Sequence, residues 1–444
     1  MRWGPRLTSV AALVAIAVTS AGCSGSDLIT SSGPTAPSTT TRSAPLAPSL
    51  AGLTGTAVSS ELPDNFVARL RGVDPLLGDT RFSSEAYDAV ITLALAAEVA
   101  KTDAPTRVAA QVPGVTRDGE KCTTYESCRA LTDSADNTGI DYDGVSGPIQ
   151  MLPNGDVGEA YYDVLKFDPE GSITRLGRRT SRAEPIAAGT TVPVPDPMTG
   201  PAPDGHLTIG MVLSRSGEGA SISEAERAGV KLAVNDVNAA GGVLGVPVRL
   251  LDNDAGAPGS ATTTAAVTSQ LARGADAVIG TSTNEGTAAI LDQVTGAGVI
   301  LVSPSATGAN LGVDDRGLFF RLSPSDSLQG SVLAGAVAAD GHLAPVLVVE
   351  QSQFGLDSAV AVSKGLTAVG ATARGSLSID PAAVPADLSA QVAASGADSV
   401  VFIGSNQSTG AMMRSMLAAG DSPSKSAWYV TDLGPELGPA LATT

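Results

Sequence analysis

Blocks of apolar residues recur along the second half of the chain and predict alternating strands and helices. The run from Leu207 to Leu213 is continuously apolar and has the length of a strand. A helix follows, with apolar residues at the i, i+3, i+4, i+7 spacing of one buried face, namely Val230, Ala233, Val234 and Val237. We interpret Ser223 to Glu226 as the capping box that opens this helix, and Gly241-Gly242 as its end.

Strand-like apolar runs then repeat at helix-length intervals, at 246–251, 275–280, 298–302, 345–350, 398–403 and 427–431. Continuous apolar strands that alternate with helices are typical of parallel sheets covered on both faces. The pattern therefore predicts an α/β fold for residues 206–444.

Residues 51–177 have a different pattern. Ser84 to Thr102 is an Ala- and Leu-rich stretch that predicts a long helix. Two apolar runs flank Pro153-Asn154-Gly155 and predict a hairpin there, and Tyr162 to Phe167 alternates like a half-buried strand. A Pro-rich stretch at 178–205 predicts a linker between this segment and the next.

The first residues are typical of a targeting segment. Arg2 and Arg6 precede an apolar run from Val10 to Val18, which is too short to span a membrane as a stable helix. Small residues then lead to Cys23, so we predict a signal peptide at 1–22 and a Ser-, Thr- and Pro-rich tether at 23–50.

Ser20-Ala-Gly-Cys23 resembles a lipobox, in which the cysteine is lipidated and becomes the first residue of the mature protein. Ser20 departs from the leucine usual at that place, and an ordinary secretory signal with an incidental cysteine is the alternative. Export implies an oxidising compartment, so we expect Cys122 and Cys128, six residues apart, to form a local disulfide rather than stay free thiols.

Composition and charge exclude several classes of function. The 444 residues carry 27 Lys and Arg against 45 Asp and Glu, a net charge of −18, which argues against a nucleic-acid-binding surface. Two histidines and three cysteines are too few for a Cys/His metal cage and make triad chemistry improbable. Gly144-Val-Ser146-Gly147 resembles a nucleophile turn, but no histidine lies near it in sequence.

Several blocks, in order, resemble the leucine/branched-chain amino-acid-binding family, the type I solute-binding proteins of ABC importers. They are Gly229 to Gly245, Asp252-Asn-Asp254, Ala277 to Gly280, Val302 to Thr307 and Phe320 to Asp326. Residues 51–177 resemble the closing third of the same family, through Ala86 to Val90, the Cys122…Cys128 loop, Asp141 to Pro148 and Asn154-Gly-Asp156.

The family's end therefore precedes its beginning in this chain. We interpret the order as a circular permutation in which 51–177 and 206–444 form one two-lobed binding protein, with lobe 1 at about 206–325 and lobe 2 at about 335–435. The alternative is a fragment of a tandem array, whose incomplete domains pair between chains.

The resemblance implies a ligand site between the lobes. By the family's pattern, Ser305 offers a backbone group and Thr307 its hydroxyl and amide to an amino acid's carboxylate and ammonium. Asn284 stands where the family usually has serine, and either donates to a carboxylate or caps the next helix. Asp432 falls near the acidic partner of the ligand's ammonium, although a solvated loop aspartate is the alternative.

Other positions depart further from the family. Phe354 replaces a tyrosine, and Ser405 and Ile222 stand where aromatic side chains are common, so we expect a wider pocket. Tyr87 either reaches the cleft or belongs to the core.

The function implied is a lipid-anchored, exported receptor that binds a small amino-acid-like solute and presents it to a permease. It needs no cofactor, catalyses nothing and acts as a monomer. A sensor or adaptor of the same fold, and a structural envelope lipoprotein with a degenerate cleft, are the alternatives.

Overall fold

The computed structural model describes residues 50–59, 61–132, 139–169, 172–184, 193–196, 199–216, 219–257, 259–308, 311, 315–433 and 437. The signal peptide at 1–22, Cys23 and nearly all of the tether lie outside these residues. Leu50, which we assigned to the tether, is instead buried in a hydrophobic core with Leu53 and Trp428. None of the helices within the described ranges is long and apolar enough to cross a membrane.

A five-stranded parallel sheet forms from the middle of the chain, in the order β11-β10-β9-β7-β8. Its strands are β7 (Thr208–Leu213), β8 (Arg249–Asp254), β9 (Ala277–Gly280), β10 (Ile300–Ser303) and β11 (Phe319–Arg321), connected through α5 (Ala220–Ala239), α6 (Ala261–Ala272) and α7 (Asn284–Gly296). The strand predicted at 246–251 begins three residues later in the structure, at Arg249. Val246 instead forms an antiparallel β-bridge with Val243.

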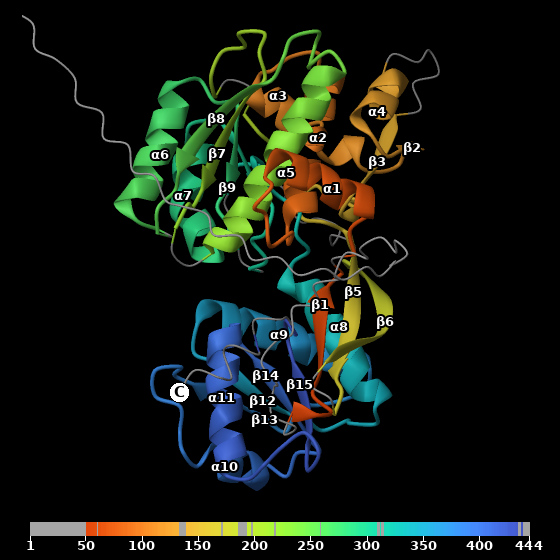
Figure 1. Ribbon diagram of the computed structural model, residues 1–444, viewed down its shortest axis with the longest axis vertical. Helices are drawn as coiled ribbons and strands as arrows, with labels where there is room; N and C mark the ends of the chain where they lie inside the picture. The colour runs from red at the N-terminus through yellow and green to blue at the C-terminus, as the bar shows by residue number, and fades with distance from the viewer. Residues whose placement is uncertain are drawn as a thin grey trace, which may run out of the picture. The chain divides into compact units, whose positions relative to one another are not determined.

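A seven-stranded sheet, in the order β13-β12-β14-β15-β1-β5-β6, combines strands from both ends of the chain. The later residues supply β12 (Val346–Glu350), β13 (Gly375–Ile379), β14 (Ser399–Ile403) and β15 (Ala427–Val430), with helices α8 (Asp326–Ala339), α9 (Gln353–Ala368), α10 (Leu388–Ala394) and α11 (Asn406–Ala418). The early residues supply β1 (Thr54–Val58), β5 (Glu159–Phe167) and β6 (Ile173–Arg182). Figure 1 shows β1 between β15 and β5.

The pairing of β1 joins the two segments into one hydrogen-bonded sheet. Thr54 and Gly55 align in parallel with Tyr429 and Val430 of β15, and the other edge of β1 pairs antiparallel with β5. The two segments that we expected to form one fold therefore share a single sheet.

The remaining early elements pack on the five-stranded side. They are α1 (Asp64–Val73), α2 (Ser83–Ala100), α3 (Pro105–Ala109), the 3₁₀ turn Pro113–Val115, β2 (Glu120–Cys122), α4 (Tyr125–Thr132), β3 (Ile140–Gly144) and β4 (Gly147–Pro148). The predicted helix at 84–102 is confirmed as α2, which lies beside α5 (Figure 1). A Cβ at Gly229 of α5 would collide with the carbonyl oxygen of Ser83, so only glycine permits this close approach.

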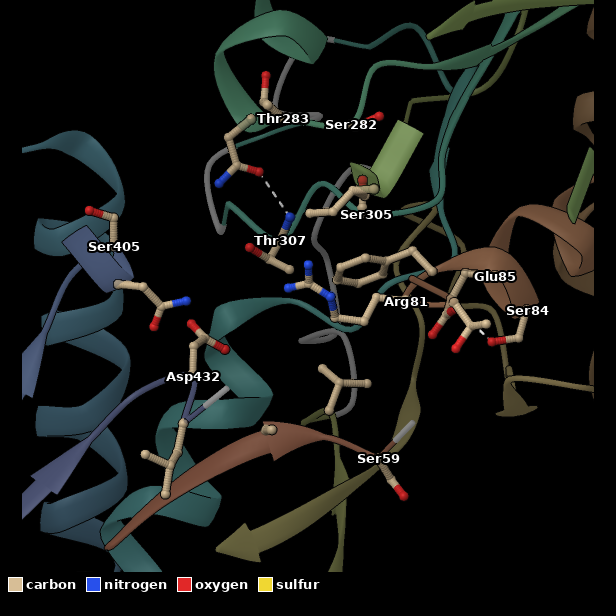
Figure 2. A pocket seen from close by; sticks show the side chains of 18 of the residues that line it. Ser59, Arg81, Ser84, Glu85, Ser282, Thr283, Ser305, Thr307, Ser405 and Asp432 are labelled. Atoms are coloured by element: carbon tan, nitrogen blue, oxygen red, sulfur yellow. Dashed lines mark hydrogen bonds between the residues drawn. The ribbon is translucent and has the colours of Figure 1, made fainter. Parts of the chain in front are cut away.

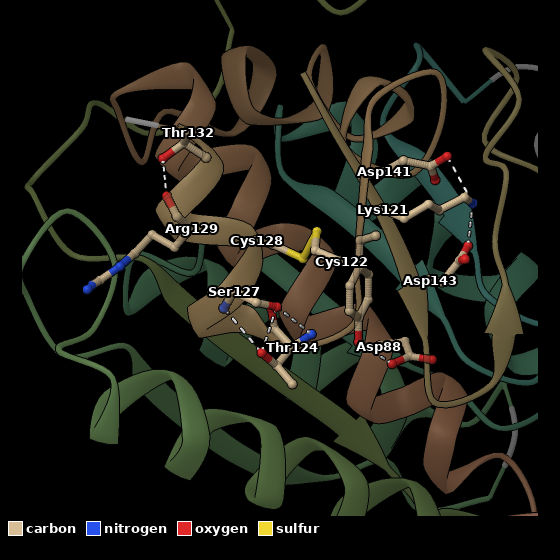
Figure 3. Close-up of a disulfide and its surroundings, with 11 residues drawn as sticks. Asp88, Lys121, Cys122, Thr124, Ser127, Cys128, Arg129, Thr132, Asp141 and Asp143 are labelled. Atoms are coloured by element: carbon tan, nitrogen blue, oxygen red, sulfur yellow. Dashed lines mark hydrogen bonds and ion pairs between the residues drawn. A yellow bond between two sulfur atoms is a disulfide. The ribbon is translucent and has the colours of Figure 1, made fainter. Parts of the chain in front are cut away.

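The expected disulfide is confirmed. Cys122 at the end of β2 bonds to Cys128 in α4, with the Cα atoms 5.2 Å apart (Figure 3). Its cysteines are only six positions apart in sequence, so it stabilises the local structure rather than the connection between the two segments.

Three local predictions were wrong. Residues 149–152, directly before Pro153, form no strand, and the long antiparallel hairpin is β5–β6 instead. Residues 178–182, predicted as linker, form the end of β6. Ser223 does not open α5, which begins at Ala220 after Gly219, so Ser223 and Glu226 lie inside the helix.

The end of the linker is fixed rather than loose. The backbone amides of Asp204, Gly205 and His206 all donate to Oδ2 of Asp103, at 2.9, 2.7 and 3.0 Å. Asp103 lies between α2 and α3. These hydrogen bonds therefore attach the end of the linker, just before β7, to the early segment.

Replacing Gly229 with alanine should destabilise the fold, because the added methyl group forces α2 and α5 apart. Overpacking of this kind costs about 1–3 kcal/mol. Gly72, in the exposed part of α1, has no atom within 4 Å of the place that an added methyl group would occupy, so Gly72→Ala is the matched control. Chemical denaturation should show a loss for Gly229→Ala and no loss for Gly72→Ala; equal stability of both variants would contradict the packing.

Candidate functional site

A cavity of about 550 Å³ lies where residues from both ends of the chain meet. The early segment contributes the end of β1 and residues 80–85, and the later segment contributes residues that follow β9, β10, β14 and β15. The carboxyl ends of parallel strands are where ligands commonly bind in α/β folds. Figure 2 shows Asp432 and Ser405 on one side, Ser84 and Glu85 on the other, and Arg81 and Thr307 between them.

Every residue that the sequence predicted for ligand binding lines this cavity. They are Asn284, Ser305, Thr307, Phe354, Ser405 and Asp432, joined by Ile222. Tyr87 does not reach it, since its ring is buried against Phe66 and its hydroxyl donates to Asp236 Oδ2 at 2.6 Å. Ser146 is also elsewhere, where its hydroxyl donates to the buried carboxylate of Asp88 at 2.6 Å.

Several helices begin at the cavity wall. The first residues of α2, α7, α9 and α11 line it, and unpaired amides make such helix starts electropositive. Thr283 caps α7 by accepting from the amide of Gly286, and Ser405 caps α11 by accepting from that of Ser408. The Ser405 side chain is thus occupied by its own helix, although it borders the cavity.

Asn284 does not cap α7, which was one of its two predicted roles. Thr283, not Asn284, caps α7, and Oδ1 of Asn284 accepts from the amides of Thr307 and Gly308 at 2.9 and 3.1 Å. The amide that we expected Thr307 to offer to a ligand is therefore already paired. Arg321, which is fully buried, fixes the same turn by donating to the carbonyl of Gly308 at 2.6 Å.

Glu226 lies directly behind this wall and was missed by the sequence analysis. Ser305 Oγ donates to its Oε1 at 2.5 Å, and Ser282 Oγ donates to its Oε2. Burial raises the pKa of Glu226 to about 7, although both hydroxyls act to lower it. Glu226 lies four residues before Val230, and this spacing places it on the apolar face of α5. The spacing could have indicated a buried carboxyl group, but we interpreted Glu226 as part of a capping box.

Arg81 and Glu85 were also missed, because no motif surrounds them. Arg81 is the basic side chain among the described residues of the cavity wall, and it is held by Asp79, with Nε 3.0 Å and Nη2 2.5 Å from Oδ2. Burial raises the pKa of Glu85 to about 7. The hydroxyl of Ser84 donates to the Glu85 carboxylate at 2.8 Å and acts in the opposite direction, to lower this pKa.

Asp432 follows β15 at the opposite side of the cavity. Its φ of 51° lies in the left-handed region, which few residues other than glycine adopt. Burial raises its pKa, and Gln329 Nε2 donates to its Oδ1 at 2.8 Å. Burial also raises the pKa of nearby Asp326 to about 7, helped by the negative charge of Asp432.

Apolar side chains complete the wall, among them Val58, Leu62, Phe82, Ile222, Phe354 and Leu433. A mostly apolar cavity with a few fixed polar groups is typical of small-molecule sites. Within the described ranges, no cluster of three or more His, Cys, Asp or Glu side chains is arranged to hold a metal ion.

Comparison with known families supports a relationship to solute-binding proteins. The family model described as periplasmic binding protein matches residues 206–442, more than half of the chain. A curated relative, Leu/Ile/Val-binding protein homolog 3 of Brucella melitensis, is 28% identical over 219 residues. That match covers 48% of this chain and only 58% of the relative's length.

Two solved structures of binding proteins are also similar to this chain. A leucine-, isoleucine-, valine-, threonine- and alanine-binding protein from Brucella ovis is 20% identical, with a TM-score of 0.47, over 54% of this chain and 63% of that one. A branched-chain amino acid transporter substrate-binding protein from Streptococcus pneumoniae, in complex with isoleucine, is 26% identical, with a TM-score of 0.40, over 51% of this chain and 64% of that one.

Proposed function

We propose that this chain, which belongs to the periplasmic binding protein family, is the extracytoplasmic receptor of an ABC importer. In this proposal it binds a small amino-acid-like solute in the cavity and delivers it to a permease. The observation that carries the proposal is the convergence of all six predicted binding residues on one cavity of about 550 Å³. That volume is within the usual range for small-molecule sites.

The charges around the cavity favour a zwitterion. Helix starts and Arg81 attract a carboxylate at one part of the wall. Asp432 supplies the opposite charge that a buried ammonium needs. The apolar residues between them accept a hydrocarbon side chain, so the arrangement suits an amino acid better than a sugar or a purely anionic solute.

The mechanism that we infer is closure around the ligand. The cavity wall is divided between residues near the five-stranded sheet, such as Thr307, and residues near the seven-stranded sheet, such as Asp432. A ligand that contacts both groups stabilises the arrangement in which they are close, and thereby shifts the population towards it. A permease that recognises only this closed arrangement would bind only receptor molecules that carry a ligand.

We also infer that the chain order is a circular permutation. The support is that β1 pairs with β15 while residues 80–85 contribute to the same cavity as Thr307 and Asp432. In this interpretation the stretch from 183 to 205 joins what are elsewhere the free ends of the fold.

Replacing Asp432 with asparagine should weaken amino-acid binding by at least tenfold, because a charged hydrogen bond contributes about 1.5–3 kcal/mol. Thr307→Ala should also weaken it. Asp387→Asn, at an exposed position before α10, is the matched control and should bind normally. Calorimetry with L-leucine, L-isoleucine and L-valine measures all three variants.

If none of these amino acids, nor any small carboxylate or amide in a thermal-shift screen, stabilises the native protein, the receptor proposal fails and a degenerate cleft is favoured. A bound ligand must raise stability by RT ln(1 + [L]/Kd). If a ligand binds but Asp432→Asn leaves its affinity unchanged, Asp432 is not its ammonium partner.

We further propose that the protein is exported and anchored to the outer face of the membrane through a lipid on Cys23. Mass spectrometry of the membrane fraction should show a mature chain that begins at a diacylated Cys23, and Cys23→Ala should release the protein. A mature chain that begins elsewhere, with an unmodified N-terminus, would contradict the anchor.

A further inference from the structure

Glu226 controls the direction in which two hydroxyl groups of the cavity wall point. Its side chain is fully buried in α5, and its two oxygens accept hydrogen bonds from Ser305, at 2.5 Å, and from Ser282. Ser305 and Ser282 both line the cavity, on the loops that follow β10 and β9. Figure 2 shows them on the same part of the wall as Thr307.

While Glu226 is ionised, both hydroxyl hydrogens point away from the cavity, because a carboxylate only accepts hydrogen bonds. The seryl oxygens then present lone pairs to a ligand. The neighbouring amides of Thr307 and Gly308 are paired with Asn284 Oδ1. This part of the wall is therefore rich in acceptors, and it is unfavourable for a carboxylate in spite of the nearby helix start.

We propose that Glu226 is a positioning residue, and that a carboxylate ligand binds at Ser282 together with one proton taken up by Glu226. This inference rests on the proposed function and specifies how its site selects a ligand. Glu226 touches no ligand in this scheme and acts only through Ser282, while Ser305 stays hydrogen-bonded to Oε1.

One proton from solvent adds to Oε2 of Glu226, and the resulting acid donates to Ser282 Oγ. Ser282 turns its own hydroxyl hydrogen to the ligand carboxylate, while Ser305 keeps donating to Oε1. Ser223 Oγ lies 2.6 Å from Ser282 Oγ, and a hydroxyl oxygen has two lone pairs, so Ser282 accommodates both neighbours. No bond other than the O–H bonds changes.

The charged groups around Glu226 place this change near neutral pH. Glu85, from α2, is the negative neighbour and opposes ionisation, whereas Arg227, in α5 itself, favours it. Arg227 is in turn paired with Asp252 and donates to the carbonyl of Leu213 at 2.8 Å. Burial is the largest cause and raises the pKa of Glu226 to about 7, so the group loses its proton as the pH rises from 6 to 8.

The expected consequence is an affinity that falls as the pH rises. If only the protonated form binds the carboxylate, the apparent Kd scales inversely with the protonated fraction, which changes about tenfold between pH 6 and pH 8 for a pKa of about 7. Free amino acids remain zwitterionic over that range, so the ligand's own charge does not account for such a change.

The test is calorimetry of the full chain with L-leucine and L-isoleucine at pH 6 and pH 8, in buffers of different ionisation enthalpy. We expect about tenfold weaker binding at pH 8, with uptake of close to one proton per ligand there and almost none at pH 6. Glu226→Gln keeps a neutral donor next to the serines, so it should bind equally at both pH values without proton uptake. Glu224→Gln, exposed in the same helix, should behave like the native protein.

Three outcomes are distinct. Binding that is independent of pH in the native protein, or a pH dependence that persists in Glu226→Gln, overturns this inference and leaves the receptor proposal intact. A tenfold change that Glu226→Gln removes supports both. If neither the native protein nor Glu226→Gln binds these amino acids at either pH, this inference is overturned and the proposed amino-acid specificity falls with it.

Discussion

The parallel pairing of β1 with β15 holds the two ends of the chain in one sheet. Without β1, the backbone groups on one side of β15 would be an open sheet edge, and buried amides and carbonyls must be paired. β1 also brings Val58, Ser59 and Leu62 to the cavity and leads into α1 and α2. A strand from the N-terminal part of the chain thus completes a sheet formed by C-terminal strands, and it also contributes residues to the candidate site.

The parts of the fold that burial determines were predictable from sequence. Continuously apolar strands such as β7 and β14 are buried on both faces, so their runs mark them directly. β13 was missed because it is an edge strand with exposed polar residues, and β11 because three residues give no period. The sequence near Pro153 has turn chemistry, and a turn does lie there, but the long antiparallel hairpin forms between β5 and β6.

Site residues were predictable from sequence where they lie in or near blocks that resemble the family. They were not predictable where their role depends on contacts between segments far apart in the chain. Thr307 lies in a recognisable block, Asp432 directly follows a predicted strand near the family's acidic position, and both line the cavity. Ser223 and Glu226 have the spacing of a capping box, and nothing in the sequence alone says that α5 begins earlier. The pairing of Asn284 with the amides at 307 and 308 depends on two loops that only folding brings together.

Buried carboxyl groups with raised pKa values lie in or next to the wall of the cavity. Glu85, Glu226, Asp326 and Asp432 all have raised pKa values because burial disfavours their ionised forms. Serine hydroxyls, not cations, partner Glu85 and Glu226, so these groups stay responsive to protons. A stable core does not require such groups, and their concentration at one cavity is typical of a functional site.

We infer that residues 51–177 and 206–444 of one chain complete a single fold. Light scattering of the chain from residue 50 onward, coupled to size-exclusion chromatography over a wide range of concentration, tests it most directly. We expect the mass of one chain at every concentration. A stable dimer that does not dissociate on dilution would contradict it, because two incomplete segments would then be pairing between molecules.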